Sequence, residues 1–364
     1  MGQDDYRKLI SGQSKGTAAA ALRAVLSIAG QIYAPFITLR NLLYSKGLIK
    51  IHQAGVPVIS IGNITTGGTG KTPLVIWLAN MLHEKNISTA ILTRGYKETK
   101  NLKLKTKNYK DEVAILIKNC PQAKIIVNPD RAAGAAEAVN RFAAKVLIMD
   151  DGFQHRRLHR ELDIVTIDAT EPFGYGKLLP AGLLREPVTA LKRTAAVVIT
   201  RTDQITETQL KQLEEKLLSI NPDMVIAKSI HAPVCVKPAA DKQIGIEQLK
   251  EKKLFAFCGI GNPDAFLNTI KRLGADLVGS RIYNDHHHYT DDDIDDIYQL
   301  AQYRKADFVL TTEKDWTKIE NRKSKIENQP IPFAYLAIEL KITAGKDRII
   351  RLIEDVLAGK ILQK

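Results

Sequence analysis

The stretch Thr65-Thr-Gly-Gly-Thr-Gly-Lys-Thr-Pro73 decides the fold of this chain. It follows an apolar run over residues 56–62 and precedes a helical apolar pattern that begins at Leu74. Glycines let backbone amides close on phosphate oxygens, and the start of a helix adds partial positive charge. The order strand, glycine-rich turn, Lys-Thr, helix therefore predicts a loop that wraps the phosphates of a nucleoside triphosphate.

Two side chains of this loop have expected roles. Lys71 is predicted to reach the β- and γ-phosphates, and the Thr72 hydroxyl to face Mg²⁺. The usual spacing G-x-x-x-x-G-K-[ST] has glycine where this chain has Thr65. The backbone amides that bind phosphate must therefore be positioned by the later glycines of the loop. The predicted nucleotide-binding residues are Gly67, Gly68, Thr69, Gly70, Lys71 and Thr72. A glycine-rich turn that only caps a βα unit is the alternative.

The composition is that of a globular protein with more than one domain. The chain has 364 residues, a length greater than one typical hydrophobic core uses. Of these residues 45% are hydrophobic and 26% are charged, as in globular proteins. Its three cysteines, Cys120, Cys235 and Cys258, form no C-x-x-C pair, so neither a disulfide framework nor a zinc site is indicated and a reducing cytoplasmic compartment fits best. The formal net charge of +13 favours anionic partners, but no nucleic-acid-binding motif accompanies it.

The N-terminal region is rich in apolar residues. Arg23 and Arg40 bracket an apolar run of 16 residues, which Pro35 interrupts. Spanning a bilayer takes about 20 apolar residues, so we expect residues 17–44 to form a helix, or a broken helix pair, that lies in the cytoplasmic interface of a membrane. An amphipathic helix docked on its own domain is the alternative.

From Val56 onward, short apolar runs alternate with helical stretches, which predicts an α/β fold with a parallel sheet covered on both faces. Predicted strands are 56–62, 89–93, 124–127, 145–150, 163–168 and 195–200, and predicted helices are 72–84, 131–144 and 207–219. A second series has strands at 254–258, 276–283 and 307–311 and helices at 263–273 and 291–305.

We therefore predict four parts. They are a membrane-associating segment (1–50), a P-loop NTPase-type nucleotide-binding domain with a parallel sheet (51–230), a smaller α/β domain (231–340), and a C-terminal helix that packs back on the P-loop domain (341–364). The lysine-rich stretch 97–110 has no clear period and is expected to be a solvated loop or a basic rim near an anionic lipid.

A second motif with expected chemistry runs from Val146 to His155. Its strand ends in Asp150 and Asp151, which places carboxylates at the carboxyl edge of the sheet, where ligands bind in open α/β folds. In P-loop proteins an aspartate there holds Mg²⁺ or its water shell. The predicted magnesium set is Thr72, Asp150, Asp151 and Gln154. A helix cap with a surface acid is the alternative.

Three further residues are predicted to contact substrate. Leu178–Pro187 combines apolar residues with glycine and two prolines, which is typical of a rigid loop, and it carries Arg185 and Glu186. Arg94 ends a predicted strand at the same edge of the sheet. For these charged residues a structural salt bridge is the competing interpretation.

The motifs together resemble the tetraacyldisaccharide 4′-kinase family, which phosphorylates the lipid A precursor in Gram-negative bacteria. They are Thr65–Pro73, Leu92–Tyr96, Asp150–His155, Leu179–Pro187, Asn284–Tyr289 and Thr312–Asp315. The resemblance runs from about Pro35 to Trp316. It implies ATP, Mg²⁺, a P-loop domain joined to a smaller C-terminal α/β domain, and an N-terminal membrane-associating helix.

The resemblance also implies a catalytic pair. The family has a carboxylate in a Gly-Asp-Glu motif, which here is Lys110-Asp111-Glu112, so Asp111 takes this role while Lys110 departs from the usual glycine. The family pairs that carboxylate with the first histidine of its Asp-His-His element, here His286. Since a sugar hydroxyl is a poor nucleophile, a positioned carboxylate must accept its proton, and a histidine can orient that carboxylate. A metal site at residues 286–288 or a plain surface loop is the alternative.

The expected function is that of an ATP-dependent lipid kinase, with Lys71, Asp111 and His286 as its catalytic residues. It would act on the 4′-hydroxyl of a lipid A disaccharide 1-phosphate at the cytoplasmic face of the inner membrane, as a peripheral protein on an anionic surface. Neither nucleic acid nor a required protein partner is expected. Because Asp111 and His286 lie in different predicted domains, their pairing would require the cleft between these domains to close.

Two other functions remain open at this point. Ile199–Asp203 resembles the N-K-x-D signature that reads guanine, although its asparagine is absent, and suggests a GTPase-type metallochaperone or partitioning switch. A basic membrane-surface scaffold would explain the charge, but it leaves Lys71, Asp111 and the two adjacent aspartates without a role.

Overall fold

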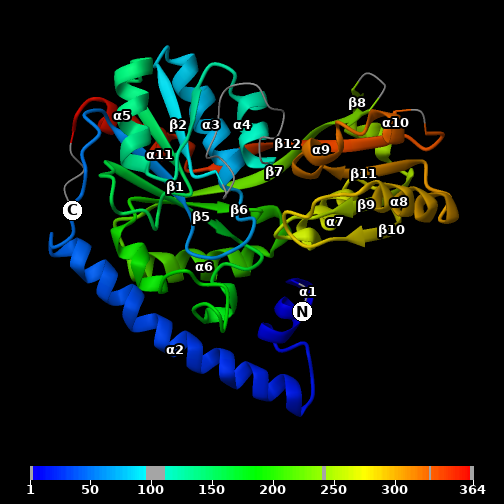
Figure 1. Ribbon diagram of the computed structural model, residues 1–364, viewed down its shortest axis with the longest axis horizontal. Helices are drawn as coiled ribbons and strands as arrows, with labels where there is room; N and C mark the ends of the chain where they lie inside the picture. Colours follow the sequence, from blue (N-terminus) through cyan, green and yellow to red (C-terminus); the bar gives the residue numbers. More distant parts are fainter. Residues whose placement is uncertain (1–2, 96–110, 240–242, 328, 361–364) are drawn as a thin grey trace. The chain divides into compact units, whose positions relative to one another are not determined.

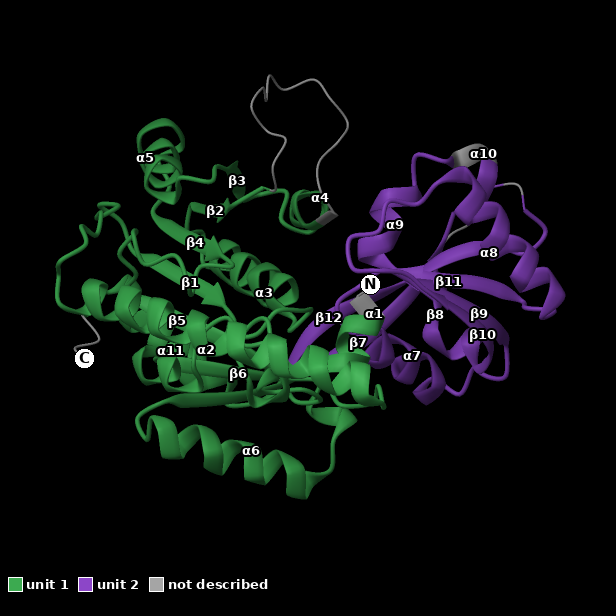
Figure 2. Ribbon diagram, turned by 60° about the horizontal axis from the view of Figure 1, so that its bottom comes forward, with its two compact units in different colours: residues 1, 3–230, 342–364 green, residues 2, 231–341 purple. Residues whose placement is uncertain are grey.

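The computed structural model describes residues 3–95, 111–239, 243–327 and 329–360, which form two compact units. Unit 1 comprises residues 3–230 together with the segment that starts at residue 342, and unit 2 comprises residues 231–341 (Figure 2). The chain passes from one unit to the other within two long strands, β7 (Val225–Pro238) and β12 (Phe333–Ala344).

Unit 1 is built on a parallel sheet with the strand order β7-β6-β5-β1-β4-β2-β3. The strands are β1 (Val58–Gly62), β2 (Thr89–Thr93), β3 (Lys124–Val127), β4 (Val146–Asp150), β5 (Leu162–Asp168) and β6 (Ala196–Thr200). Every residue of β1, β2, β4 and β6 is buried, as expected of a sheet covered on both faces. The predicted α/β class is confirmed.

Helices cover this sheet. They are α3 (Lys71–Glu84), α4 (Asp111–Asn119), α5 (Arg131–Phe142), α6 (Glu207–Ile220) and α11 (Lys346–Leu357), with 3₁₀ turns at Gly174–Gly176, Val188–Arg193 and Thr202–Gln204. Figure 1 shows α3 and α6 on opposite sides of the strands. The α6 residues Leu213 and Leu217 pack against Val197 and Ile199 of β6. The C-terminal helix α11 lies in unit 1, where it contacts β5.

Two helices precede the sheet of unit 1, α1 (Gln3–Ile10) and α2 (Thr17–Ser45). The second is one continuous helix of 29 residues with Pro35 inside it, drawn in blue along the outside of unit 1 in Figure 1. By length and composition alone it could cross a membrane, which the run of 16 residues between the two arginines did not suggest.

Unit 2 contributes further strands to the same sheet. Its strands β9 (Lys253–Cys258), β10 (Asp276–Ile282) and β11 (Phe308–Thr312) have the order β10-β9-β11-β12-β7, in which β10, β9, β11 and β12 pair parallel, and β8 (Ile244–Gly245) pairs antiparallel with β7. The helices are α7 (Pro263–Arg272), α8 (Asp291–Tyr303), α9 (Glu313–Ile319) and α10 (Lys323–Ile326), with a 3₁₀ turn at Ile246–Leu249. Phe257, Trp316 and Phe333 belong to its aromatic core.

Candidate active site

The glycine-rich loop connects β1 to α3 at the carboxyl edge of the unit 1 sheet. Gly67 and Gly70 have φ values of +113° and +87°, a backbone region that glycine enters without steric cost. Gly70 directly precedes the first residue of α3, Lys71. At the start of the loop, a Cβ atom on Gly62 would lie 2.5 Å from the Cβ of Phe153, so β1 and the 150–155 segment approach each other as closely as a glycine permits.

The departure at Thr65 has a structural explanation. Thr65 is buried and forms an isolated antiparallel bridge with Leu184, and the Thr66 amide donates to the Leu183 carbonyl at 2.8 Å. The first part of the phosphate loop is therefore held by the 178–187 loop rather than by a glycine turn of its own.

A buried polar network supports the middle of the phosphate loop. The Thr69 hydroxyl bonds to the Asn63 amide at 3.0 Å and to the Thr166 hydroxyl at 2.8 Å. The Thr200 hydroxyl donates to the Thr69 carbonyl at 3.0 Å, and Arg201 donates to the Gly68 carbonyl at 2.8 Å. These bonds occupy two consecutive carbonyls of the loop and so keep them from facing a bound anion. The Thr69 amide donates within the loop, to the Gly67 carbonyl at 3.0 Å.

Asp151 joins the two predicted cations of the site. Its carboxylate lies 3.3 Å from Lys71 Nζ, and it accepts two hydrogen bonds from Arg185 at 2.8 and 3.0 Å. Burial raises the pKa of Asp151, but Lys71 and Arg185 outweigh this effect and hold the pKa well below its ordinary value. Asp151 also has a φ of +51°, a strained backbone of the kind that occurs at functional sites.

Asp150 has the opposite electrostatic environment. Burial, reinforced by repulsion from Glu112 and Asp151, raises its pKa to about 7 against the attraction of Lys71 and Arg131. Its carboxylate accepts a long hydrogen bond of 3.4 Å from the Thr93 hydroxyl. Two adjacent carboxylates thus differ in charge state near neutral pH, and a cation beside Asp150 would favour its ionised form.

The predicted magnesium residues fit a cation that arrives with phosphate. Thr72 lies in the first turn of α3, one residue after Lys71. Gln154 donates to the Asn63 carbonyl at 2.8 Å and accepts from Arg185 at 3.2 Å. In the described parts of the chain, no group of three or more His, Cys, Asp or Glu side chains could hold a metal ion. Phosphate oxygens or water would have to complete the coordination, which is the usual way Mg²⁺ is bound.

The predicted substrate residues differ in exposure. Arg94 is exposed directly after β2, whereas the Glu186 side chain is fully buried, with Arg193 at 3.0 Å and the Asn41 amide at 2.7 Å. These contacts match the salt-bridge interpretation of Glu186. Asp111 is the first residue of α4, but its side chain, like Lys110, lies outside the described part of the structure.

His286 lies in unit 2, in the turn that follows β10. It has a φ of +62°, and its ring Nε2 is 3.4 Å from Lys314 Nζ, which also pairs with Asp285 at 3.0 Å. The neighbouring His287 bonds to Asp293 at 3.0 Å and stacks on Tyr283. The adjacent His286 and His287 thus have different partners, which does not resemble a shared metal site.

Comparison with known proteins decides the family. The family model described as Tetraacyldisaccharide-1-P 4′-kinase matches residues 22–358. The chain belongs to this kinase family.

Relatives named tetraacyldisaccharide 4′-kinase match nearly the whole chain. One from Halothermothrix orenii is 36% identical over 89% of this chain and 90% of its own length. One from Anaeromyxobacter sp. strain Fw109-5 is 36% identical over 95% of both. The solved "apo" form of LpxK from Aquifex aeolicus in complex with ATP is 29% identical and covers 92% of this chain and 99% of its own, with a TM-score of 0.68. The GTPase-type alternative is not favoured by these relatives.

In this kinase-family chain, the motif that resembled a guanine-binding signature supports the phosphate loop. Thr200 and Arg201 of Ile199–Asp203 bond to carbonyls of the phosphate loop, and Arg201 also pairs with Asp168. These supporting roles, and that of Thr166, were not predicted from the sequence. The only local signal was the position of the motif directly after a buried strand at the same sheet edge as the loop.

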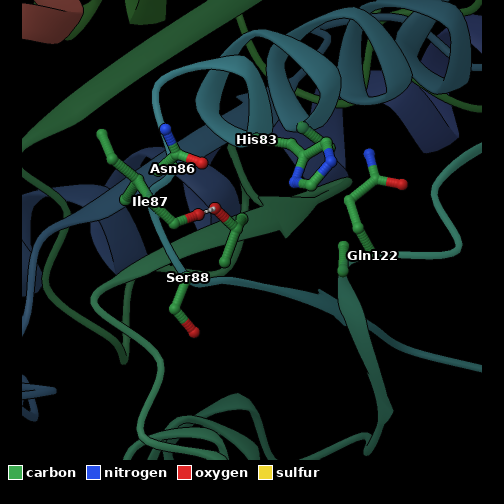
Figure 3. A pocket seen from close by; sticks show the side chains of 8 residues that line it. His83, Asn86, Ile87, Ser88 and Gln122 are labelled. Atoms are coloured by element: carbon green, nitrogen blue, oxygen red, sulfur yellow. Dashed lines mark hydrogen bonds between the residues drawn. The ribbon is translucent and has the colours of Figure 1, made fainter.

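A cavity of about 240 Å³ lies elsewhere in unit 1 of this kinase-family chain (Figure 3). It is lined by residues such as His83, Asn86, Ser88 and Gln122, which come from the end of α3, the turn before β2 and the turn before β3. None of the predicted site residues lines it. The amino ends of the strands meet there, on the opposite edge from the phosphate loop, so we do not assign this cavity to the active site.

Proposed function

We propose that this chain is an ATP-dependent kinase that transfers the γ-phosphoryl group of ATP to the 4′-hydroxyl of a tetraacyl disaccharide 1-phosphate in lipid A biosynthesis. One observation supports this most strongly. In a member of this kinase family, Lys71 at the start of α3 lies 3.3 Å from Asp151 at the edge of the same sheet. A cation held beside a phosphate loop by a carboxylate is ready to exchange that partner for the phosphates of ATP.

The nucleotide half of the reaction belongs to unit 1. Residues 67–72 would bind the phosphates, the Thr69 amide only once it leaves the Gly67 carbonyl to which it donates. Lys71 would neutralise charge that moves onto the leaving phosphate. Bound Mg²⁺ supplies further neutralisation of the phosphate oxygens, and Thr72, Asp150, Asp151 and Gln154 are the residues that would hold it. Arg185 keeps Asp151 oriented through two hydrogen bonds.

The acceptor half needs a base. We assign this role to Asp111, with His286 orienting the carboxylate or sharing its proton, because a sugar hydroxyl must lose its proton as the phosphoryl group arrives. Arg94 and Arg185 remain the proposed contacts for the phosphate or sugar oxygens of the substrate.

The acceptor is a lipid, and α2 offers a surface for a membrane. Exposed apolar side chains recur along it at intervals of three or four residues, which places them on one face of the helix. They are Leu22, Val25, Ile28, Ile32, Phe36, Leu39 and Leu42, each more than 40% exposed. The buried Gly30 and Ile37 lie on the other side, toward unit 1. We infer peripheral attachment to the cytoplasmic face of the inner membrane, where anionic lipids attract a chain of net charge +13.

The test of the activity is direct. Purified protein is incubated with ATP, Mg²⁺ and a lipid A disaccharide 1-phosphate in mixed micelles, and the lipid is analysed by mass spectrometry. We expect one added phosphate at the 4′ position, lost with Lys71→Met. The proposal fails if the wild-type protein leaves the lipid unchanged, or if GTP is turned over without any need for the lipid.

Attachment is tested separately by sedimentation with vesicles that contain phosphatidylglycerol. Replacing Ile32 and Phe36 together by Asn should reduce the fraction bound, because two apolar side chains leave the lipid. Equal binding of this variant and the wild type would contradict the assignment of this face.

A further inference from the structure

We propose that α2 positions the active site in addition to any attachment it provides. Tyr33 and Asn41, on the face of α2 that packs on unit 1, would be positioning residues that fix the backbone beside Arg185 and Asp151. This inference rests on the proposed function, because it concerns the rate of the same phosphoryl transfer.

The first observation is that α2 contacts the 178–187 loop at three places. A Cβ atom on Gly30 would lie 3.3 Å from the Cβ of Ala181 and 3.3 Å from the Leu178 carbonyl, so the helix backbone touches the loop. The Tyr33 hydroxyl donates to the Arg185 carbonyl at 2.9 Å. The Asn41 amide donates to the Glu186 carboxylate at 2.7 Å.

The second observation is that α2 also contacts the segment after β4. The Arg40 guanidinium donates to the Gln154 carbonyl. Arg156 donates to the Asn41 carbonyl at 2.8 Å and to the Ser45 hydroxyl at 3.3 Å. One helix therefore bonds both to the segment that carries Asp151 and Gln154 and to the loop that carries Arg185.

A few direct contacts connect the 178–187 loop to Lys71. The Arg185 amide donates to the Ile64 carbonyl at 2.7 Å, directly before the phosphate loop. The Arg185 guanidinium binds Asp151, and Asp151 pairs with Lys71. A shift of α2 against the 178–187 loop would thus move Arg185 relative to both the loop and its carboxylate partner.

The chemistry of the contact points to positioning rather than simple docking. Asn41 Oδ1 is buried without a hydrogen-bond partner among the described residues, and an unpaired buried acceptor costs about 1–3 kcal/mol. An apolar residue would dock the helix without this cost. Asn41 instead supplies a donor to Glu186, whose fully buried charge otherwise bonds to Arg193. An asparagine at this position fits a need to hold Glu186, and with it the backbone of Arg185, in one place.

The experiment compares single-group deletions on one helix. Tyr33→Phe and Asn41→Leu each remove a bond from α2 to the 178–187 loop. The matched control is Thr38→Val, because among the described residues the exposed Thr38 hydroxyl bonds only to the Ala34 carbonyl within α2. Each protein is assayed with ATP, Mg²⁺ and lipid A disaccharide 1-phosphate in mixed micelles, which present the substrate without a planar membrane.

We expect kcat to fall about tenfold for Tyr33→Phe and about 30-fold for Asn41→Leu, since small misplacements away from the chemistry can reduce rates by up to about 100-fold. Thr38→Val should match the wild type. The KM for ATP and vesicle sedimentation should change little. Because the loss of a buried bond costs about 1–3 kcal/mol of stability, rates are measured well below each protein's thermal midpoint, so that a lower kcat of the folded protein separates positioning from a loss of fold or of attachment.

The inference is overturned if Tyr33→Phe and Asn41→Leu keep the kcat of Thr38→Val, or if any loss is accounted for by a smaller folded fraction at the assay temperature or by weaker vesicle binding. Tyr33→Phe decides the matter if Asn41→Leu does not fold, because it removes a single oxygen. A wild-type protein that leaves the lipid unchanged would refute the proposed function instead, so the two failures are distinguishable.

Discussion

Both units of this chain have parallel strands with polar residues after the carboxyl ends of the strands, yet the two edges are built for different tasks. In unit 1, a glycine-rich loop opens α3, and Lys71 and Arg185 meet at Asp151. In unit 2, the corresponding edge has a turn with Asp285 and His286, which contact Lys314.

The difference shows what a shared topology leaves open. At the edge of unit 2, the buried Asp315 accepts from the Gly259 amide at 2.9 Å and the Thr312 hydroxyl at 2.8 Å, and it pairs with Lys318. At this edge the Asp315 carboxylate therefore takes up the backbone and hydroxyl donors. In unit 1, the side chains of Thr200 and Arg201 donate to carbonyls of the phosphate loop, so these carbonyls do not face a bound anion. The loop, rather than the order of strands, specifies phosphate binding.

The largest expected effect is the loss of the proposed base. Asp111→Ala should lower kcat by about 10³-fold, since general-base catalysis contributes about 10²–10⁴-fold. ATP affinity, measured by calorimetry with a nonhydrolysable analogue, should stay near that of the wild type. Unchanged turnover would remove Asp111 from the mechanism. Loss of ATP binding would mean that it belongs to the nucleotide site.

The contribution of unit 2 is tested at His286. His286→Ala should lower kcat by about 10²-fold, because an oriented acid–base partner is lost, and it should leave the affinity for the ATP analogue unchanged. His288→Ala is the matched control from the same run of histidines, with an exposed side chain. Equal rates for the two variants would assign the reaction to unit 1 alone.

Local patterns were enough to predict much of the fold. Strands 89–93 and 124–127 have the predicted bounds, because compact apolar runs between helices leave little choice of register. The sequence analysis missed β7 and β12. In β7, polar residues such as Lys228, Ser229 and His231 interrupt the apolar pattern, so no short run marks the strand.

For the site as well, local motifs predicted individual residues but not their contacts. Lys71 and Asp151 were selected from local motifs, but their contact through space, and that of Arg185 with Asp151 across 34 positions, depend on strand order. Thr200 and Asn41 act through partners more than 100 residues away. No local pattern carries such information. The pairing of Asp111 with His286 stays a prediction.

The paired aspartates of unit 1 give a pH prediction. Because the folded-state pKa of Asp150 is raised to about 7, the unfolded chain releases this proton first as pH rises. Stability is therefore lost between the unfolded value near 4 and about pH 7, and the loss is complete above that. Asp150→Asn lacks this titration. From pH 5 to pH 8 the wild type should lose roughly 2–3 kcal/mol relative to Asp150→Asn, measured by urea unfolding without nucleotide.

Mg²⁺ with ATP should reduce that difference, because a cation stabilises the ionised carboxylate. His155, whose pKa is lowered to about 4 mainly by burial, is present in both proteins and cancels in the comparison. A difference independent of pH would show that Asp150 is ionised throughout this range.

The smallest expected effect comes from removing one buried threonine hydroxyl at the sheet edge of each unit. Thr200 and Thr311 are both fully buried, and each donates to a backbone carbonyl, that of Thr69 at 3.0 Å in unit 1 and that of Phe257 at 2.8 Å in unit 2. The Thr200 hydroxyl also lies 3.3 Å from the Ile167 carbonyl. Replacing either threonine by Val removes its hydroxyl donor and should cost about 1 kcal/mol of stability in urea unfolding. Only Thr200→Val should also weaken binding of the ATP analogue, by about threefold to tenfold, because only Thr69 belongs to the phosphate loop. Equal affinities of the two variants would mean that the loop keeps its shape without this support, and that its glycines alone distinguish the edge of unit 1 from that of unit 2.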